Sequence, residues 1–363
     1  MVGVPGAAHV YFMPGKLFIA LLLTGCAVRA EGRDAPADSG TVDSAVVDTS
    51  PSSTPMDGGF VVDALAETTA DTATACKDEP PSTGSAVMTT MAADYGAFYK
   101  SYDLGPVPGM PTGHLGGCIL KDDNTLLLAG DSESPSGGLY SIKVKRGPCG
   151  HIVGWDGSAA KVADAPYIDA NILALPASTL LYSQWPQNKL GMLTSGATSP
   201  SKEVDLAPVG VDSSIGGLGF VPKGYAAEGE LRGVTWSLGN WFHLALKPEG
   251  ALYNVTTATK KVTLPNGPGG FAYVPAGSPG FPKNRLILSE WSADSVATYE
   301  VDGEGDPIVE TRKAFFESFP KPWGAYFDPK TGDFVFLTWG SPPDRVFVVQ
   351  GFSKPPPPPP APK

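Results

Sequence analysis

Four tryptophans recur at one point of a repeating pattern, each directly after an apolar run: Trp185, Trp236, Trp291 and Trp339. Gln184 and Glu290 stand immediately before two of them. Aromatic rings beside amide and carboxylate groups can stack on sugar faces while the polar groups bind hydroxyls, so this set predicts a ligand-binding rim. Packing between repeats requires the same recurrence, and packing is the default interpretation. Trp241 and Trp323 are predicted to be core residues.

A second set of loop side chains could hold a calcium or zinc ion that activates water: His114, Asp131, Asp169, Glu290 and Asp294. Polar loop residues with ordinary hydrogen bonds are the default interpretation here too, so no cofactor is predicted and calcium is a secondary expectation. The sequence contains no GxSxG, HExxH or GxxxxGK motif. Enzymatic activity is therefore the less favoured expectation.

Four cysteines are present, and the first of them belongs to the N-terminal segment described next. In an oxidising compartment the other three predict one disulfide and one free thiol. Cys118 with Cys149 is the favoured pair because both fall in the first repeat. Cys76 with Cys149 is the alternative.

The N-terminal segment is typical of an export signal. Leu17 to Leu23 form an apolar run that is too short to cross a bilayer, and Lys16 precedes it. The run ends in the letters LTGC, residues 23–26, which resemble the lipobox of bacterial lipoproteins. That resemblance implies cleavage of a signal peptide over residues 1–25 and acylation of Cys26, with Met13 as an alternative start.

A lipidated cysteine implies a protein attached to a membrane of the bacterial cell envelope. Ala27 follows in place of the aspartate that favours retention at the inner membrane, so the outer membrane is the favoured location. Residues 26–85 are rich in Ala, Asp, Ser, Thr and Pro and predict a disordered acidic spacer. The net charge of -11 leaves no basic surface for nucleic acid.

The 44 glycines and 37 prolines favour short strands and turns, and a repeat follows residue 110. Five segments open alike at intervals of 53, 47, 53 and 54 residues, beginning at Gly116, Asp169, Gly216, Gly269 and Trp323. Each is followed by two more apolar runs and, in most repeats, by a more polar fourth run. This pattern predicts an all-β fold, a β-propeller of four-stranded blades, with five blades favoured and six as the alternative.

The fifth repeat lacks its fourth run, and a comparable stretch, AFYKSYDLGP at residues 97–106, precedes the first repeat. We expect this N-terminal strand to complete the last blade and close the ring, which leaves no open sheet edge. The propeller domain is predicted at residues 86–352, followed by a polyproline tail at 353–363.

The run LILSEWSADSVATYEVDGEG resembles the blades of NHL-repeat and YWTD-like propellers. That resemblance implies a propeller whose top face binds ligands, and it identifies architecture only. The leading functional expectation is a binding or scaffolding module for a glycan, a peptide or an envelope protein. The alternative is a calcium-dependent hydrolase or lactonase, as in the similar gluconolactonase-like propellers.

Overall fold

The computed structural model describes residues 76–81, 87–340 and 343–357. The predicted signal peptide, Cys26, the spacer up to residue 75 and the tail from residue 358 lie outside these ranges. Within them, no helix combines the length and the apolar character of a membrane span.

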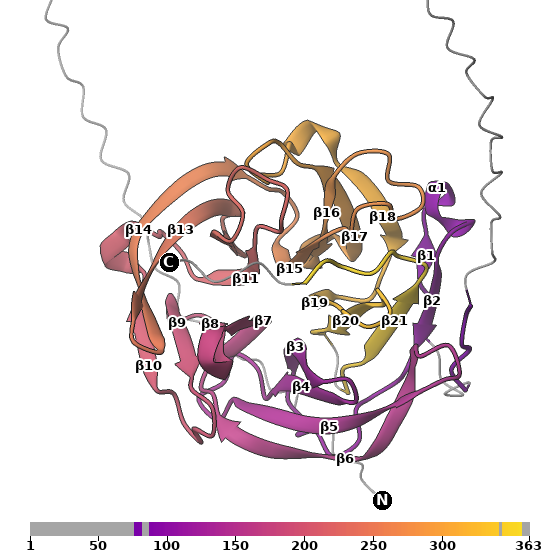
Figure 1. Ribbon diagram of the computed structural model, residues 1–363, viewed down its shortest axis with the longest axis horizontal. Helices are drawn as coiled ribbons and strands as arrows, with labels where there is room; N and C mark the ends of the chain where they lie inside the picture. The colour runs from indigo at the N-terminus through magenta and orange to yellow at the C-terminus, as the bar shows by residue number, and fades with distance from the viewer. Residues whose placement is uncertain (1–75, 82–86, 341–342, 358–363) are drawn as a thin grey trace, which may run out of the picture. The chain divides into compact units, whose positions relative to one another are not determined.

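Five antiparallel sheets surround a common centre (Figure 1). The first contains β3 (Leu115–Asp122), β4 (Thr125–Gly130), β5 (Gly138–Arg146) and β6 (Ile152–Asp164). The second contains β7 (Ile168–Leu175), β8 (Thr179–Gln184), β9 (Lys189–Leu193) and β10 (Lys202–Asp205). The third contains β11 (Ile215–Phe220), β12 (Leu231–Thr235), β13 (Asn240–Glu249) and β14 (Leu252–Thr263).

The fourth sheet contains β15 (Pro268–Tyr273), β16 (Arg285–Glu290), β17 (Ser295–Glu300) and β18 (Lys313–Ser318). The fifth contains β19 (Pro322–Phe327), β20 (Phe334–Thr338), β21 (Val346–Gln350) and the N-terminal strand β2 (Lys100–Asp103). The chain is therefore a five-bladed β-propeller, and the favoured blade number is confirmed. The first strands β3, β7, β11, β15 and β19 lie nearest the centre (Figure 1).

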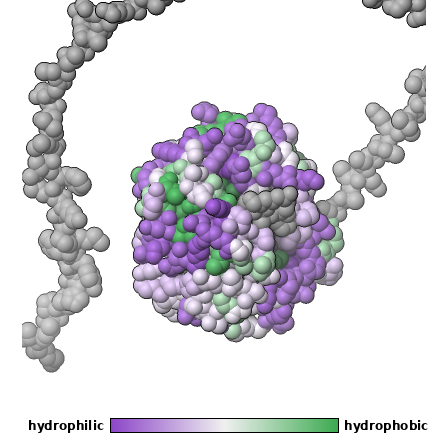
Figure 2. All heavy atoms as spheres, turned by 60° about the vertical axis from the view of Figure 1, so that its left-hand side comes forward, coloured by the Kyte–Doolittle hydropathy of each residue, from purple (hydrophilic) through white to green (hydrophobic). Residues whose placement is uncertain are grey.

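Burial explains the order of strands within a blade. The second strands β4, β16 and β20 are buried along their whole length because neighbouring blades cover both of their faces. The outer strand β6 exposes most of its residues and β14 exposes half of its residues, as their polar sequences require. Figure 2 accordingly shows a face that is mostly hydrophilic, with smaller apolar patches between.

The ring closes as the sequence predicts, because β2 pairs antiparallel with β21 in the fifth blade. Two further elements in this region were not predicted. Strand β1 (Thr90–Met91) extends the fourth blade beyond β18, and the short helix α1 (Ala93–Gly96) connects it to β2.

Glycines let the innermost strands approach each other closely. A Cβ on Gly217 would lie 2.2 Å from the carbonyl oxygen of Gly269 in the next blade, and one on Gly324 would lie 2.3 Å from that of Gly116. The Asn171 side chain crosses this narrow centre and hydrogen-bonds backbone groups of three other blades, donating to the Ala325 carbonyl at 2.9 Å. These contacts therefore close the centre of the propeller at the level of Asn171.

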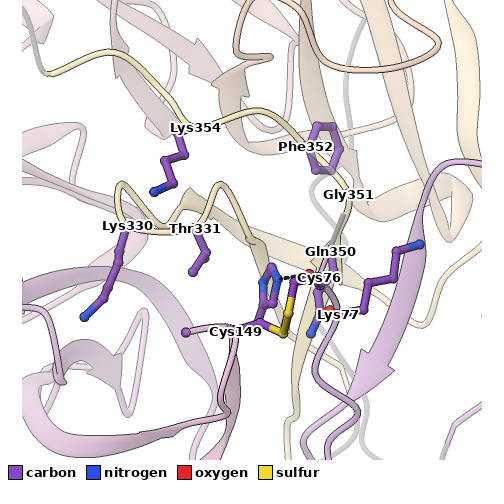
Figure 3. Close-up of a pocket in the computed structure, with 11 residues that line it drawn as sticks. Cys76, Lys77, Cys149, Lys330, Thr331, Gln350, Gly351, Phe352 and Lys354 are labelled. Carbon is purple, nitrogen blue, oxygen red and sulfur yellow. Dashed lines mark hydrogen bonds between the residues drawn. A yellow bond between two sulfur atoms is a disulfide. The ribbon is translucent and has the colours of Figure 1, made fainter. Parts of the chain in front are cut away.

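The disulfide joins Cys76 to Cys149, which corrects the favoured Cys118–Cys149 pairing and agrees with the alternative (Figure 3). Cys118 is a free, buried thiol on β3. Its position on an innermost strand holds it among apolar side chains and away from the β5–β6 loop that carries Cys149.

Residues 76–81 are consequently part of the folded domain, whereas the sequence assigned them to the spacer. The buried Asp78 carboxylate accepts hydrogen bonds from the backbone N–H groups of Cys149 and His151 at 3.0 and 3.1 Å. The Gln350 amide on β21 binds the Asp78 backbone, with 2.7 Å to its carbonyl oxygen. Residues 76–81 thus connect the first blade to the fifth.

Candidate functional site

The four recurring tryptophans meet at one mouth of the propeller. Each is the first residue after the second strand of its blade, in the second to fifth blades. Successive ring centroids lie 6.0, 5.7 and 5.9 Å apart in edge-to-face contacts, in the order Trp185, Trp236, Trp291 and Trp339. One repeated backbone position therefore produces a nearly continuous aromatic wall.

A fifth indole forms the floor of this mouth. Trp323 is the second residue of β19 and is buried, as predicted, but its ring crosses the centre of the propeller. A Cβ on Gly269, at the matching position of the fourth blade, would lie 2.7 Å from that ring. In the second blade the matching residue is Asp169, whose Oδ1 accepts a 2.7 Å hydrogen bond from Trp323 Nε1.

Together these rings enclose a small cavity of about 90 Å³. Five of the seven tryptophans of the chain line it, and Glu133 is the remaining lining residue. Pockets for drug-sized ligands measure about 300–1,000 Å³, so only a compact terminal group can enter here. We call this cavity and its six lining residues the tryptophan mouth.

Glu133 replaces a tryptophan in the first blade. The residue directly after β4 is Asp131, but its carboxylate accepts a hydrogen bond from Ser136. The backbone is left-handed at both Asp131 and Glu133, with φ of 52° and 61°, and the Glu133 N–H donates to the Ile168 carbonyl at 3.1 Å. This tight turn directs Glu133, rather than Asp131, into the mouth.

Glu133 and Asp169 form a pair of neighbouring acids beneath the rings. Burial raises the pKa of Glu133 to about 7. Burial and the adjacent Glu133 carboxylate raise the pKa of the fully buried Asp169 well above its usual range. The pair therefore retains a proton near neutral pH. Asp169 Oδ2 accepts no hydrogen bond from any described residue.

Two residues predicted for the rim are instead buried behind it. Gln184 donates to the Pro166 carbonyl and to Glu203, at 3.0 and 2.8 Å. Glu290 accepts hydrogen bonds from Arg312, Tyr299, Ser295 and Asn266. Both side chains stabilise their own blades, and the polar groups expected to bind sugar hydroxyls are not available to a ligand.

The structure does not bring the five predicted metal ligands together, and Asp294 pairs with Lys321 at 3.0 Å. Glu290 is occupied by its four donors, and Asp131 by Ser136. His114 stacks on Trp339, with centroids 3.8 Å apart, and its Nδ1 lies 2.9 Å from Asp344. Asp169 lies under the tryptophan mouth with Glu133.

Within the described ranges, one group of three side chains has the spacing of a metal site: His243, Glu304 and Asp306. Arg232 and Trp241 already donate to Asp306 Oδ1, at 3.1 and 2.9 Å. A guanidinium beside the carboxylate supplies the positive charge that a metal ion would bring, so this group is an internal ion-pair network.

Sequence reasoning missed Glu133 and the part that the buried Trp323 takes in lining the mouth. Glu133 stands in the stretch GDSESPSGG, between the second and third strands of the first repeat. The rule that placed the four tryptophans on the rim applies to that loop as well, but it pointed to Asp131. Only the turn geometry distinguishes the two acids.

No protein-family model and no curated protein matches the sequence. Among solved structures, the chain is similar to an oxidoreductase (glucose dehydrogenase) from Thermus thermophilus, with 14% identity over 69% of this chain and 99% of that one, and a TM-score of 0.41. It is also similar to virginiamycin B lyase from Staphylococcus aureus, with 12% identity, 69% and 99% coverage, and a TM-score of 0.38. A third is Myxococcus xanthus glutaminyl cyclase, with 11% identity, 69% and 95% coverage, and a TM-score of 0.41. At these TM-scores none of their activities transfers to this chain, and the propeller assignment rests on its own sheet topology.

Proposed function

We propose that the chain is a lipid-anchored binding protein of the bacterial cell envelope, whose propeller holds a partner at the tryptophan mouth. The observation that carries the binding role is the convergence of four equivalent tryptophans and Trp323 on one open cavity. Packing between blades does not need a cavity at that point. Half-buried indoles around an unfilled space are characteristic of a surface that buries a ligand.

The size and the lining of the cavity restrict which class of partner can bind there. A sugar ring needs polar neighbours for its hydroxyls, and Gln184 and Glu290 are committed elsewhere. A peptide or an envelope protein that inserts one compact group fits better. We do not extend the proposal to a calcium-dependent hydrolase, because the predicted metal ligands are dispersed among the described residues.

The anchor rests on the residues 23–26, LTGC, and on the acidic spacer that follows. Two or more acyl chains on Cys26 would hold the domain durably at a membrane. Metabolic labelling with an alkyne fatty acid should mark the protein, and Cys26→Ser should abolish both the label and membrane retention. Membrane retention that survives this substitution would contradict the lipid anchor.

Binding at the mouth can be tested in cells by photo-crosslinking. We expect a photoreactive phenylalanine derivative at position 236 to give adducts of defined mass. The same group at Trp155 on the outer strand β6 serves as the matched control. Adducts at both positions alike, or at neither, would contradict a binding role for the mouth.

A further inference from the structure

We propose that the tryptophan mouth binds an alkylated ammonium group, held by the indole faces and by the Glu133 carboxylate that line it. This inference rests on the proposed function and specifies the chemistry of its ligand. The face of an indole carries negative electrostatic potential, and tryptophan is the best side chain for cation–π contact. Five indoles around one cavity make such contacts from several directions at once.

The size of the cavity agrees with this ligand class. About 90 Å³ accommodates a small group such as trimethylammonium and excludes a flat sugar or a nucleobase. The walls are almost entirely apolar, which suits methyl groups better than a bare ammonium ion that keeps its hydration.

The charges around the mouth favour a cation over an anion. Glu133 lines the cavity, and the buried Asp169 is its titratable neighbour. The indole N–H groups of Trp323 and Trp291 donate to Asp169 and the Trp339 carbonyl, and those of Trp236 and Trp339 are buried. An anion would therefore meet the Glu133 carboxylate and aromatic faces, whereas a cation is attracted by both.

Two side chains that contact the rim tryptophans, Lys321 and His114, have acidic partners of their own. Lys321 pairs with Asp294 at 3.0 Å, and His114 lies 2.9 Å from Asp344. Lys321 Nζ also lies 4.4 Å from the centre of the Trp291 ring. The chain thus already uses one of these indoles for a cation–π contact on its outer side.

Choline and its neutral isostere 3,3-dimethylbutan-1-ol separate the proposed contacts from simple apolar burial. The two have the same shape, and only choline is charged. Calorimetry with the full chain at pH 8 should show choline binding at least about 10-fold more tightly than the alcohol. Equal affinities, or binding of neither, would overturn the ammonium proposal.

Two variants then locate the site. Glu133→Gln should weaken choline about 10-fold and leave the alcohol unchanged, because it removes charge without changing shape. Trp236→Leu should weaken choline more than the alcohol, because leucine keeps apolar bulk and removes the π face. Trp155→Phe is the control for loss of an indole away from the mouth, and thermal unfolding confirms that each variant is folded. Choline binding unaffected by both mouth substitutions would place it elsewhere and overturn the proposal.

The ammonium group could belong to a free solute or to a lipid head group. Sedimentation of the full chain carrying Cys26→Ser with phosphatidylcholine vesicles, against phosphatidylglycerol vesicles, distinguishes the two sources. If the protein sediments with phosphatidylcholine vesicles alone, and Glu133→Gln abolishes this, the ligand is the lipid head group. If the protein binds choline but does not sediment with either kind of vesicle, the ligand is a free solute. If the alcohol binds as well as choline and Trp236→Leu weakens both, the mouth is an apolar binding site. The proposed function then stands and the ammonium inference fails.

Discussion

Reducing or removing the Cys76–Cys149 disulfide should lower the stability of the closed propeller ring. The bond closes a loop with a sequence separation of 73 residues, and that loop contains β2, the strand that completes the fifth blade. Loop-closure entropy in the unfolded chain gives about 4 kcal/mol for a bridge of this length. For a domain of this size that corresponds to a loss of about 10 °C in the melting temperature.

The assay compares thermal unfolding of the wild type, Cys76→Ser and Cys118→Ala, each with and without a reductant. Reductant should lower the melting temperature of the wild type and of Cys118→Ala but not that of Cys76→Ser, which should already be low. Cys118 is the matched control because it is the buried, free thiol. A shift below about 3 °C would refute the reasoning, since residues 76–81 would then detach without weakening the ring.

Four further results are expected. Tyr102→Pro should destabilise the protein by about 3 kcal/mol in chemical denaturation, because Tyr102 pairs with Val348 in the hydrogen-bonded phase set by Leu104 N–H and the Val346 carbonyl, and proline removes its N–H. Gly270→Ala should lower the melting temperature strongly, since its Cβ would lie 2.7 Å from a backbone oxygen of the fifth blade, whereas Gly303→Ala meets nothing within 4 Å and should be neutral. Hydrogen bonding to the Asp333 carboxylate raises the pKa of His151 above 6.5. The stability that the protonated His151 gives to the fold is complete below pH 6.5 and is lost as the pH rises through the raised pKa. The difference in unfolding free energy between wild type and His151→Gln should therefore narrow from pH 6 to pH 9. Choline affinity measured by calorimetry should increase from pH 5.5 to pH 8 as Glu133 ionises around pH 7, and a flat profile would contradict the role of that carboxylate.

The blades could be predicted from the sequence because every blade must bury its inner strands between the two neighbouring blades. The second strand is covered on both faces, so its apolar run repeats in each blade, and the residue after it repeats its position at the mouth. That regularity is why Trp185, Trp236, Trp291 and Trp339 could be placed together before the structure was known. The pairing of β2 with β21 followed from the missing strand of the fifth repeat.

What could not be predicted depends on contacts between segments that the repeat does not relate. Cys118 and Cys149 are close in sequence, but one lies on an innermost strand and the other in an outer loop. Cys76 comes from an acidic tract that resembles a spacer, and its place beside the first blade depends on the hydrogen bonds of Asp78. The direction of the Gln184 and Glu290 side chains is likewise set by partners elsewhere in the chain, such as Arg312 just before β18.

The first blade matters to function because it breaks the pattern of the other four. Strict repetition would place a fifth tryptophan after β4, and the mouth would then be lined by indoles alone, with no charge to distinguish a cation from any apolar group. The left-handed turn at Asp131 and Glu133 brings in a carboxylate instead, next to Asp169, which is acidic where the matching residues of the other blades are glycine or tryptophan. Two departures from the repeat therefore coincide in adjacent blades and beneath the same cavity. Packing between blades does not require that coincidence, and a cation-binding site does.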